Sequence, residues 1–464
     1  MLTIFYDLET SDRNPIGQII NYCFILVDEQ YEIVDELSGL VRLSRLQIPD
    51  PGAILANRTD VIEHQKTASE SEPSAMAKIR DFIQGCILRA GGAVALAGYN
   101  SSRFDLGYLR TSFIRNGINP YFKNQIIPRD LLHVVQKAYL TSEAFRGAIQ
   151  EQRKNDAKLS LSLETVGHAL GLLSGVQIHE SREDVVLTIE VARRIREICG
   201  LDVATFDGYE GARVHSTAGS GAVYLVSRPE YDLSESAYVS KTPMAILDAN
   251  HKAALWIDLD AYAMKPDRTA IAWRSSGKHA FFMSQQSVAD ASLQDVARRA
   301  VRQFKGISLY NFFEKSTCDI EMDIYRMGFD AQALFEQAVA KNDKSILSEC
   351  VTKEPMILWV RRQLASEATS INDPKTAEIL RKYALYRYGG KFQLVKNASQ
   401  NREQHEQFNE SLGCTVQRLL HLKEAAVMQD CVDDEKLLGA LECYIRQSDI
   451  YAVAGADLIP MWAS

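Results

Sequence analysis

A short strand-like run at the start of the chain ends in two acidic residues. Residues 2–8 are mostly apolar or aromatic, and Asp7 and Glu9 stand two positions apart at the end of this run. Successive side chains of a β-strand point to opposite faces of a sheet, so Asp7 and Glu9 are expected to share one face. Two carboxylates on one face are either a solvated strand end or ligands of a metal ion. The pair alone leaves both interpretations open.

A third acidic residue follows another predicted buried strand. The apolar run over 93–99 ends at the polar residues 100–102, which are common helix caps, and a helical pattern begins beyond them. Asp105 therefore falls in the first turn of a helix, where the helix dipole favours an ionised carboxylate. It is either an ordinary first-turn aspartate or part of a site, because sites form at strand-to-helix junctions in open α/β sheets.

The last motif lies before a long amphipathic pattern. Apolar residues between 185 and 195 recur at helical spacing, so Asp184 opens a predicted helix and His179 lies in the loop before it. A surface histidine is the ordinary interpretation of His179 by itself. Three acidic motifs at strand and helix ends, in this order, instead favour one shared site.

These residue types together suit the hydrolysis of a phosphodiester bond. Four carboxylates in one place repel each other and would partly protonate unless cations neutralise them. Mg²⁺ is the expected cation because it binds through a few carboxylates, water and substrate phosphate oxygens. In a two-metal site the ions lie about 3.5–4 Å apart. A histidine, with an unperturbed pKa of about 6.5, suits the removal of a proton from water at neutral pH.

The five residues also resemble a known catalytic set. Asp7, Glu9, Asp105 and Asp184 with His179 are similar to the DEDD exonuclease superfamily, in the DEDDh branch that has a histidine in the third motif. Within it the chain resembles the bacterial exonuclease I family, whose members are single-strand-specific DNA 3′-to-5′ exonucleases. The matching segments are 51–55, 98–105, 129–132 and 160–164, with looser matches at 214–221, 254–260 and 386–388.

The resemblance implies a fold and its division. It implies an α/β, ribonuclease H-like exonuclease domain with a mixed sheet over 1–200, an SH3-like barrel domain over 201–350 and a C-terminal helical domain over 351–464. The hydrophobic pattern agrees with this division. Strands are predicted over 2–8, 18–27, 33–41, 93–99, 222–226, 244–248, 253–257, 270–273 and 281–283, and helices from 292 onwards and over 355–364, 374–388, 401–412 and 434–448.

The resemblance also implies a role for each residue of the site. Two Mg²⁺ ions are expected, with Mn²⁺ able to replace them. Asp7 would bridge both ions, and Glu9 and Asp184 would complete the site of the ion that activates water. Asp105 would hold the second ion through water, and His179 would take the proton. Nucleoside 5′-monophosphates would then leave from the 3′ end of the strand.

Candidates for substrate binding follow from the same resemblance. Thr10, Arg129 and Arg387 are expected to contact the strand. Phe104 and Tyr108 are either walls for the last base or core residues.

Two basic stretches are further candidates for contact with a single strand of nucleic acid. Residues 381–391 interleave basic residues with tyrosines, which is how single strands are held, by stacking and phosphate pairing. The alternative is an amphipathic helix that buries its tyrosines and ends at Gly389. A loop is expected over 141–158, and it is either a solvated charged face or a second contact. Its basic residues are Arg146, Arg153, Lys154 and Lys158.

The overall charge excludes a globally basic nucleic-acid-binding protein. The chain of 464 residues has 60 acidic and 52 basic residues and a net charge of -8, so any DNA binding must use local patches. Its eight cysteines are scattered singly, without zinc-ligand spacing or a disulfide framework, which indicates buried thiols in a reducing cytoplasm. No signal peptide is expected because the first strand begins at residue 2, and no apolar run approaches the ~18 residues of a membrane span.

The resemblance implies partners and leaves two alternatives. It implies single-stranded DNA, the acidic C-terminal tail of a single-stranded DNA-binding protein, a monomeric state and a place in DNA repair or recombination. One alternative is an RNA 3′-to-5′ exonuclease similar to oligoribonuclease, although such enzymes usually have one domain. The other is a non-catalytic DNA-binding scaffold, against which the five intact catalytic positions argue.

Overall fold

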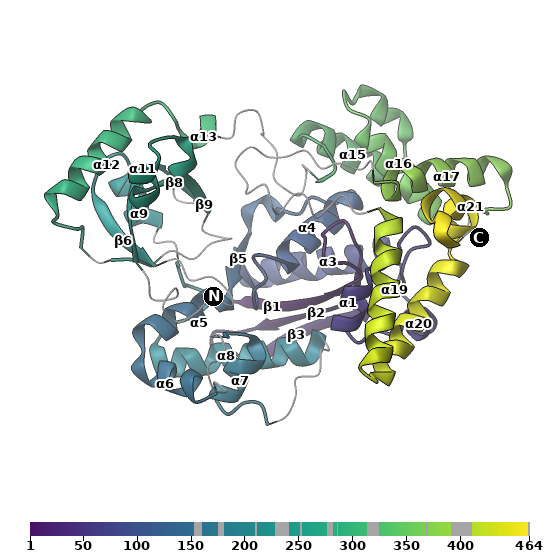
Figure 1. The fold of residues 1–464 in the computed structure, drawn as a ribbon, viewed down its shortest axis with the longest axis horizontal. Helices are drawn as coiled ribbons and strands as arrows, with labels where there is room; N and C mark the ends of the chain where they lie inside the picture. The colour runs from purple at the N-terminus through teal and green to yellow at the C-terminus, as the bar shows by residue number, and fades with distance from the viewer. Residues whose placement is uncertain are drawn as a thin grey trace.

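The computed structural model describes residues 1–152, 160–174, 181–208, 211–227, 241–250, 253–275, 282–284, 286–312, 324–366, 370–390 and 411–462. Figure 1 shows a central sheet between layers of helices, a smaller region with its own sheet, and a group of helices that leads to the C-terminus.

The central sheet has five strands in the order β3-β2-β1-β4-β5. β1 (Thr3–Thr10) and β3 (Ile33–Leu40) both pair antiparallel with β2 (Ile19–Val27). β4 (Val94–Gly98) runs parallel to β1, and β5 (Ile126–Asp130) runs parallel to β4. The predicted mixed sheet is confirmed. β5 is an additional strand, which Pro128 obscured in the apolar pattern, and proline is tolerated because β5 is an edge strand.

Helices cover both faces of this sheet (Figure 1). On one face, Ile4, Tyr6 and Leu8 of β1 pack with residues of α3 (Glu72–Ala90) and α4 (Asp105–Arg115). On the other face, Phe5 belongs to a core formed with α5 (Leu131–Thr141), α6 (Glu143–Glu151), α7 (Leu163–Ala169) and α8 (Ser181–Cys199). Two short helices, α1 (Pro51–Ala56) and α2 (Val61–Thr67), follow β3.

The loop predicted over 141–158 is wrong for its first half, which forms α6. The Ser142 hydroxyl caps this helix by accepting a hydrogen bond from Phe145 N at 3.2 Å. Phe145 and Ile149 are buried one turn apart in the core. This apolar pair is too short a pattern to stand out among the charged residues around it. Arg153, Lys154 and Lys158 lie outside the described residues.

The second sheet is antiparallel throughout, in the order β10-β6-β7-β8-β9. Each of the five strand runs predicted for this region is present. The strands are β6 (Val223–Ser227), β7 (Lys241–Ala249), β8 (Ala253–Asp258), β9 (Ile271–Ser275) and β10 (Phe282–Met283). The accompanying helices are α9 (Gly211–Thr217), α11 (Leu259–Met264), α12 (Ala291–Gln303) and α13 (Leu309–Phe312), of which α12 packs on the sheet.

The C-terminal part is helical, as predicted, but its packing begins earlier than residue 351. Tyr325 and Phe335, expected in the middle region, instead form a core with Leu358 and Trp359. Most of the helix predicted over 401–412 lies outside the described residues. The helices are α15 (Phe329–Lys341), α16 (Glu354–Ala365), α17 (Pro374–Tyr388), α19 (Leu412–Met428), α20 (Val432–Gln447) and α21 (Asp449–Leu458).

The C-terminal helices pack directly on the segment that follows β3. Leu43, Leu46 and Ile54 share a buried core with Leu419 and Leu438. Arg45 also forms an ion pair of 2.5 Å with Asp449 at the start of α21. Among the described helices, none combines the length and the apolar character needed to cross a membrane.

Candidate active site

The end of β1 places two carboxylates on the face that α8 covers. Asp7 and Glu9 alternate with Tyr6 and Leu8, which are buried in the layer of α3 and α4. The two acidic side chains therefore lie on the opposite face, as the period of a strand requires. The pairing register between β1 and β2 shifts between Glu9 and Thr10, and such a bulge changes the direction of the strand beside the acidic pair.

Helix α8 brings the most distant acidic motif to this pair. Asp184 lies in its first turn and is buried, because Val185 and Ile189 on the same helix pack into the core around Phe5. One carboxylate oxygen from each of Asp7, Glu9 and Asp184 can be chosen so that the three atoms lie within 4.8 Å of one another. This arrangement suits a divalent cation with oxygen ligands.

The electrostatics of the three carboxylates require a compensating charge. Burial, and then the charge of Asp184, raises the pKa of Asp7 to about 7. Burial, and then the charges of Asp7 and Asp184, raises the pKa of Glu9 to about 8. The Oδ2 atom of Asp7 is buried and has no hydrogen-bond partner among the described residues. A divalent cation would satisfy this oxygen and allow Asp7 and Glu9 to ionise at neutral pH.

Asp105 lies close behind this group. It is the first residue of α4 and is buried, and its pKa is raised well above the ordinary value by burial and then by the charge of Asp7. It is not one of the three residues whose oxygens meet within 4.8 Å. Asp105 therefore faces the same site from a position further from its centre.

The turn before Asp105 is held by Asp130, a residue that the sequence analysis did not single out. Asn100 N and Ser102 N donate to the Asp130 carboxylate at 2.8 and 3.1 Å, and the Ser102 hydroxyl donates at 2.5 Å. Asp130 also caps α5 by accepting from Leu132 N at 3.0 Å. The expected helix cap at 100–102 is therefore wrong: Phe104 precedes α4, without a side-chain cap. An aspartate directly before an apolar helical pattern was the available signal.

His179 lies outside the described residues, which resume at Ser181.

Two of the predicted substrate contacts, Thr10 and Tyr108, have hydrogen-bond partners within the protein. The Thr10 hydroxyl donates to Asp12 O at 2.9 Å. Tyr108 is fully buried and its hydroxyl donates to the same carbonyl, so the structure places Tyr108 in the core. Phe104 is half-buried, with its ring centroid 5.1 Å from that of Tyr108.

The two arginines predicted to bind substrate lie on different elements, Arg129 on the edge strand β5 and Arg387 on the C-terminal helix α17. Arg129 Nε donates to Ala204 O at 3.2 Å, which ties β5 to the segment after α8. Arg387 lies on α17, with its guanidinium 4.8 Å from the centre of the Tyr388 ring. Arg387 and Asp12 line one cavity; burial raises the pKa of Asp12 to about 6, and the charge of Arg387 opposes that rise.

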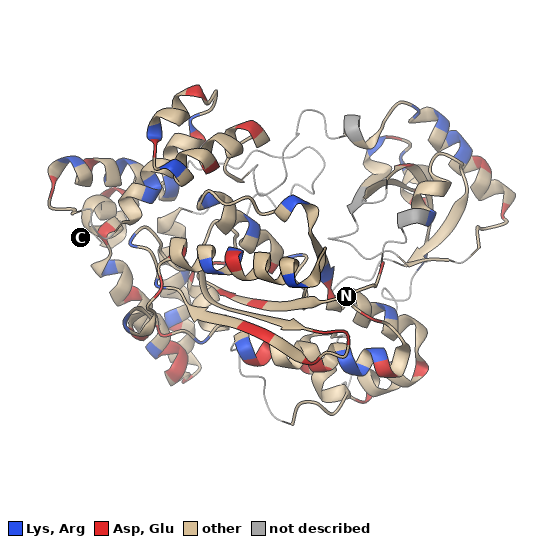
Figure 2. Cartoon of the chain, turned by 180° about the vertical axis from the view of Figure 1, so that it is seen from behind, with Lys and Arg blue, Asp and Glu red and all other residues tan. Residues whose placement is uncertain are grey.

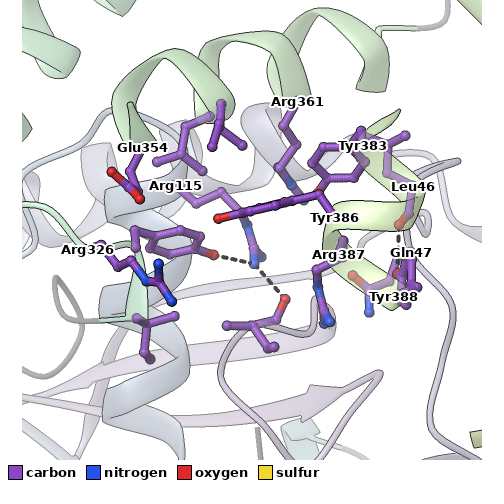
Figure 3. Close-up of a pocket in the computed structure, with 15 residues that line it drawn as sticks. Leu46, Gln47, Arg115, Arg326, Glu354, Arg361, Tyr383, Tyr386, Arg387 and Tyr388 are labelled. Carbon is purple, nitrogen blue, oxygen red and sulfur yellow. Dashed lines mark hydrogen bonds between the residues drawn. The ribbon is translucent and has the colours of Figure 1, made fainter. Parts of the chain in front are cut away.

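Residues 381–388 of the basic and aromatic stretch lie on α17, in line with the helical interpretation, but Tyr383 and Tyr386, which that interpretation buries, are only half-buried. Gly389 is the C-cap of α17, as predicted. Tyr388 is buried, and its hydroxyl donates to Leu46 O at 2.8 Å and accepts from Ile48 N at 3.0 Å. Arg381 pairs with Asp457 at 2.7 Å. Figure 3 shows Tyr383 and Tyr386 in the wall of a pocket together with Arg387.

Acidic and basic residues are mixed along the described part of the chain, and Figure 2 shows them interspersed along the helices. Arg146, a candidate for strand contact, donates instead to Tyr139 O and Leu140 O at 3.1 and 3.0 Å. These bonds cap the end of α5.

No family model matches the chain. Two curated relatives match part of it, and both are named exodeoxyribonuclease I. The protein of Buchnera aphidicola subsp. Baizongia pistaciae is 23% identical over 204 residues, which are 42% of this chain and 39% of the relative. The protein of Haemophilus influenzae is 28% identical over 201 residues, which are 41% of this chain and 39% of the relative. The match thus spans about two-fifths of either relative's length.

Solved structures match over nearly the whole chain. The structure of E. coli exonuclease I in complex with a dT13 oligonucleotide has a TM-score of 0.61 at 16% identity and covers 96% of this chain and 99% of its own. Exonuclease I from Methylocaldum szegediense has a TM-score of 0.56 at 16% identity and covers 97% and 99%. A zinc-bound form of the E. coli ExoI–ssDNA complex has a TM-score of 0.56 and covers 96% and 98%. At these identities the likeness establishes the fold.

Proposed function

We propose that this chain, which has the exonuclease I fold along nearly its whole length, is a 3′-to-5′ exodeoxyribonuclease that degrades single-stranded DNA. The observation that carries the proposal is the meeting of Asp7, Glu9 and Asp184 within 4.8 Å, at the end of the first strand of this fold. The partial sequence matches to two exodeoxyribonuclease I proteins support the same activity.

The site residues fit divalent cations, and two Mg²⁺ ions, or Mn²⁺ in their place, are part of the proposal. Asp7, Glu9 and Asp184 would hold one ion, and Asp7 with Asp105 the other. When bound, such ions stabilise the charge that develops on the phosphate and make a water molecule more acidic.

The protein's own residues would bind the substrate, orient it and move a proton. His179 takes the proton from the attacking water, whose oxygen forms a new bond to the terminal phosphorus while the bond to the 3′ oxygen of the preceding nucleotide breaks. That oxygen is protonated to a 3′ hydroxyl, and a nucleoside 5′-monophosphate leaves. Asp130 holds the turn that carries Asp105 into the site. The proposed substrate contacts remain Thr10, Phe104, Arg129 and Arg387. Tyr108 supports the loop after β1 through its hydrogen bond to Asp12 O.

The two later regions would restrict the substrate to single strands. We assign the first 200 residues to a ribonuclease H-like exonuclease domain and the five-stranded antiparallel sheet to an SH3-like domain. Residues from 324 onwards belong with the C-terminal helical domain because of their packing. A channel between these regions that admits one strand but not a duplex would explain the preference. Proposed further are a monomeric state, a cytoplasmic location, a role in DNA repair or recombination and binding of the C-terminal tail of a single-stranded DNA-binding protein.

Digestion of a 5′-labelled DNA strand tests the function. The strand is compared with the same sequence as RNA and as blunt duplex, each with Mg²⁺ and with EDTA. A metal-dependent ladder that shortens from the 3′ end of single-stranded DNA alone is the expected result. Shortening of RNA alone would assign the chain to the RNA exonucleases, and binding without shortening would assign it to the non-catalytic scaffolds.

A further inference from the structure

A buried ionic cluster joins the nuclease region to the C-terminal helices. Glu72, the first residue of α3, is 4% exposed, and its carboxylate contacts two guanidinium groups. Arg115 donates to one oxygen, and Arg361 of α16 donates to the other at 3.3 Å. Burial raises the pKa of Glu72, but the charges of Arg115 and Arg361 outweigh it and hold the pKa below the ordinary value. Glu72 is therefore ionised and links α4 of the nuclease region to α16 of the C-terminal helices.

Arg115 also contacts the loop that follows Asp7 and Glu9 in the chain. Arg115 Nη1 donates to Ile16 O at 3.1 Å and to the Tyr325 hydroxyl at 3.0 Å. In Figure 3 both bonds are drawn as dashed lines from Arg115. Arg115 and Arg361 line the same pocket. Arg115 is the last residue of α4, and Asp105 is the first. One rigid helix thus connects the ionic cluster to the site.

The loop over 11–18, which begins two residues after Glu9, is tightly held. Ser11 N donates to Gln18 O at 2.8 Å, and Asp12 O accepts from Tyr108 of α4. Gly17 lies so close to Asp12 that a Cβ atom at Gly17 would stand 2.5 Å from the Asp12 Cβ. Because the loop has little room to adjust, a displacement at Ile16 is passed on to its start beside Glu9.

We propose that Arg361 is a positioning residue for the metal site, acting from the C-terminal helices through Glu72 and Arg115 on the loop after Glu9. This inference rests on the proposed function for its meaning, since it states how the C-terminal region supports the nuclease carboxylates. Without Arg361, Glu72 keeps one partner and Arg115 loses the geometry that two opposed contacts impose. The ligands Glu9 and Asp105, at the two ends of this arrangement, then bind a cation less well.

The test measures metal binding and DNA binding separately. Mn²⁺ binding to the DNA-free protein is followed by electron paramagnetic resonance, and binding of a fluorescent dT strand is followed by anisotropy in EDTA. Arg361→Gln removes the charge, and Arg361→Lys keeps it and serves as the milder variant. The matched control is Arg362→Gln, since the neighbouring Arg362 is half-buried and has no ion-pair partner in the described part of the chain. Thermal unfolding verifies that each variant is folded.

For Arg361→Gln we expect the Mn²⁺ dissociation constant to rise about five-fold or more, with DNA affinity in EDTA within two-fold of the unsubstituted protein. Arg361→Lys should recover part of the loss, and Arg362→Gln should bind Mn²⁺ normally. Unchanged Mn²⁺ binding in folded Arg361→Gln, or in folded Arg361→Met if the first variant does not fold, would overturn the inference. A loss confined to DNA affinity would also overturn it and make Arg361 a strand contact. Because Mn²⁺ binding needs no substrate, inactivity of the unsubstituted protein on DNA would count against the proposed function alone.

Discussion

The Asp130 carboxylate accepts two hydrogen bonds from Ser102, one from its backbone N–H at 3.1 Å and one from its hydroxyl at 2.5 Å, three residues before Asp105. The backbone of Asn100, which has a positive φ of 56°, donates to the same carboxylate. Asp130 therefore holds the turn between β4 and α4 in the conformation that delivers Asp105 to the site. A buried carboxylate outside the group of Asp7, Glu9 and Asp184 can in this way decide where a metal ligand stands.

Asp130→Asn should lower kcat by about 10–100-fold, because a ligand displaced by about 1 Å costs on that order. The amide keeps one acceptor but presents donors to the Ser102 N–H and hydroxyl, so stability should fall by about 1–3 kcal/mol. Single-turnover digestion of a labelled strand and thermal unfolding measure the two effects. Asp60→Asn is the control, since Asp60 caps α2 in the same manner, is not one of the three clustered carboxylates, and asparagine caps equally well. A folded Asp130→Asn variant with unchanged kcat would contradict this role.

Asp7→Asn and Asp184→Asn should each reduce turnover by orders of magnitude. Both side chains belong to the group of oxygens within 4.8 Å, and an amide neither carries the charge nor offers two acceptor oxygens. DNA binding in EDTA should be largely retained, because phosphate contacts do not depend on these groups. The exposed Asp35 provides the control, as Asp35→Asn. Normal turnover of either active-site variant would remove the two-metal hypothesis.

Without metal, the protein should lose stability as the pH rises from about 4 to about 8. The pKa values of Asp7 and Glu9 are raised to about 7 and about 8, against ordinary values of about 3.9 and 4.3 in the unfolded chain. Between these limits the folded state binds more protons, so the free energy of unfolding falls with pH. Below pH 4 both states are protonated and the penalty is absent. Above pH 8 it is complete.

Thermal unfolding in EDTA at pH 5, 6, 7 and 8 measures this effect, and the series is repeated with Mg²⁺. Mg²⁺ should raise Tm most at pH 8, where the carboxylates are charged. Asp7→Asn should flatten the profile in EDTA and raise Tm at pH 8, since it removes one of the repelling groups. A wild-type Tm in EDTA that does not decline relative to that of Asp7→Asn over this range would show that the acidic group is not strained.

Arg387→Met tests whether the C-terminal helix contacts the strand. If Arg387 binds a phosphate, affinity for single-stranded DNA falls, and the slope of log K against log salt decreases in magnitude by about 0.7. Arg381→Met is the control, because Arg381 already pairs with Asp457 on the exposed face of the same helix. An unchanged slope would mean that Arg387 acts within the protein, on Asp12 and the loop after β1.

Some parts of the site could be predicted from the sequence because they are local. The alternation of β1 places Asp7 and Glu9 on one face whatever packs there, and a helical pattern after a strand places Asp105 in a first turn. The amphipathic run after Asp184 likewise predicts α8. Boundaries were less predictable, as α6 and β5 show, because a short apolar pair or a proline-containing edge strand is stabilised by its neighbours and not by its own pattern.

The sequence by itself determined that the four acidic residues stand at the end of a strand or in the first turn of a helix, because those preferences reside in a few neighbouring residues and in the period of their apolar side chains. Tertiary structure alone decided which of these ends meet. The packing of α8 on the face of Phe5 brings Asp184 to Asp7, the edge strand β5 delivers Asp130 to the turn before Asp105, and the helix α16 sets Arg361 against Glu72. Such contacts depend on the shapes of whole buried faces, which form only when segments far apart in the chain exclude water together.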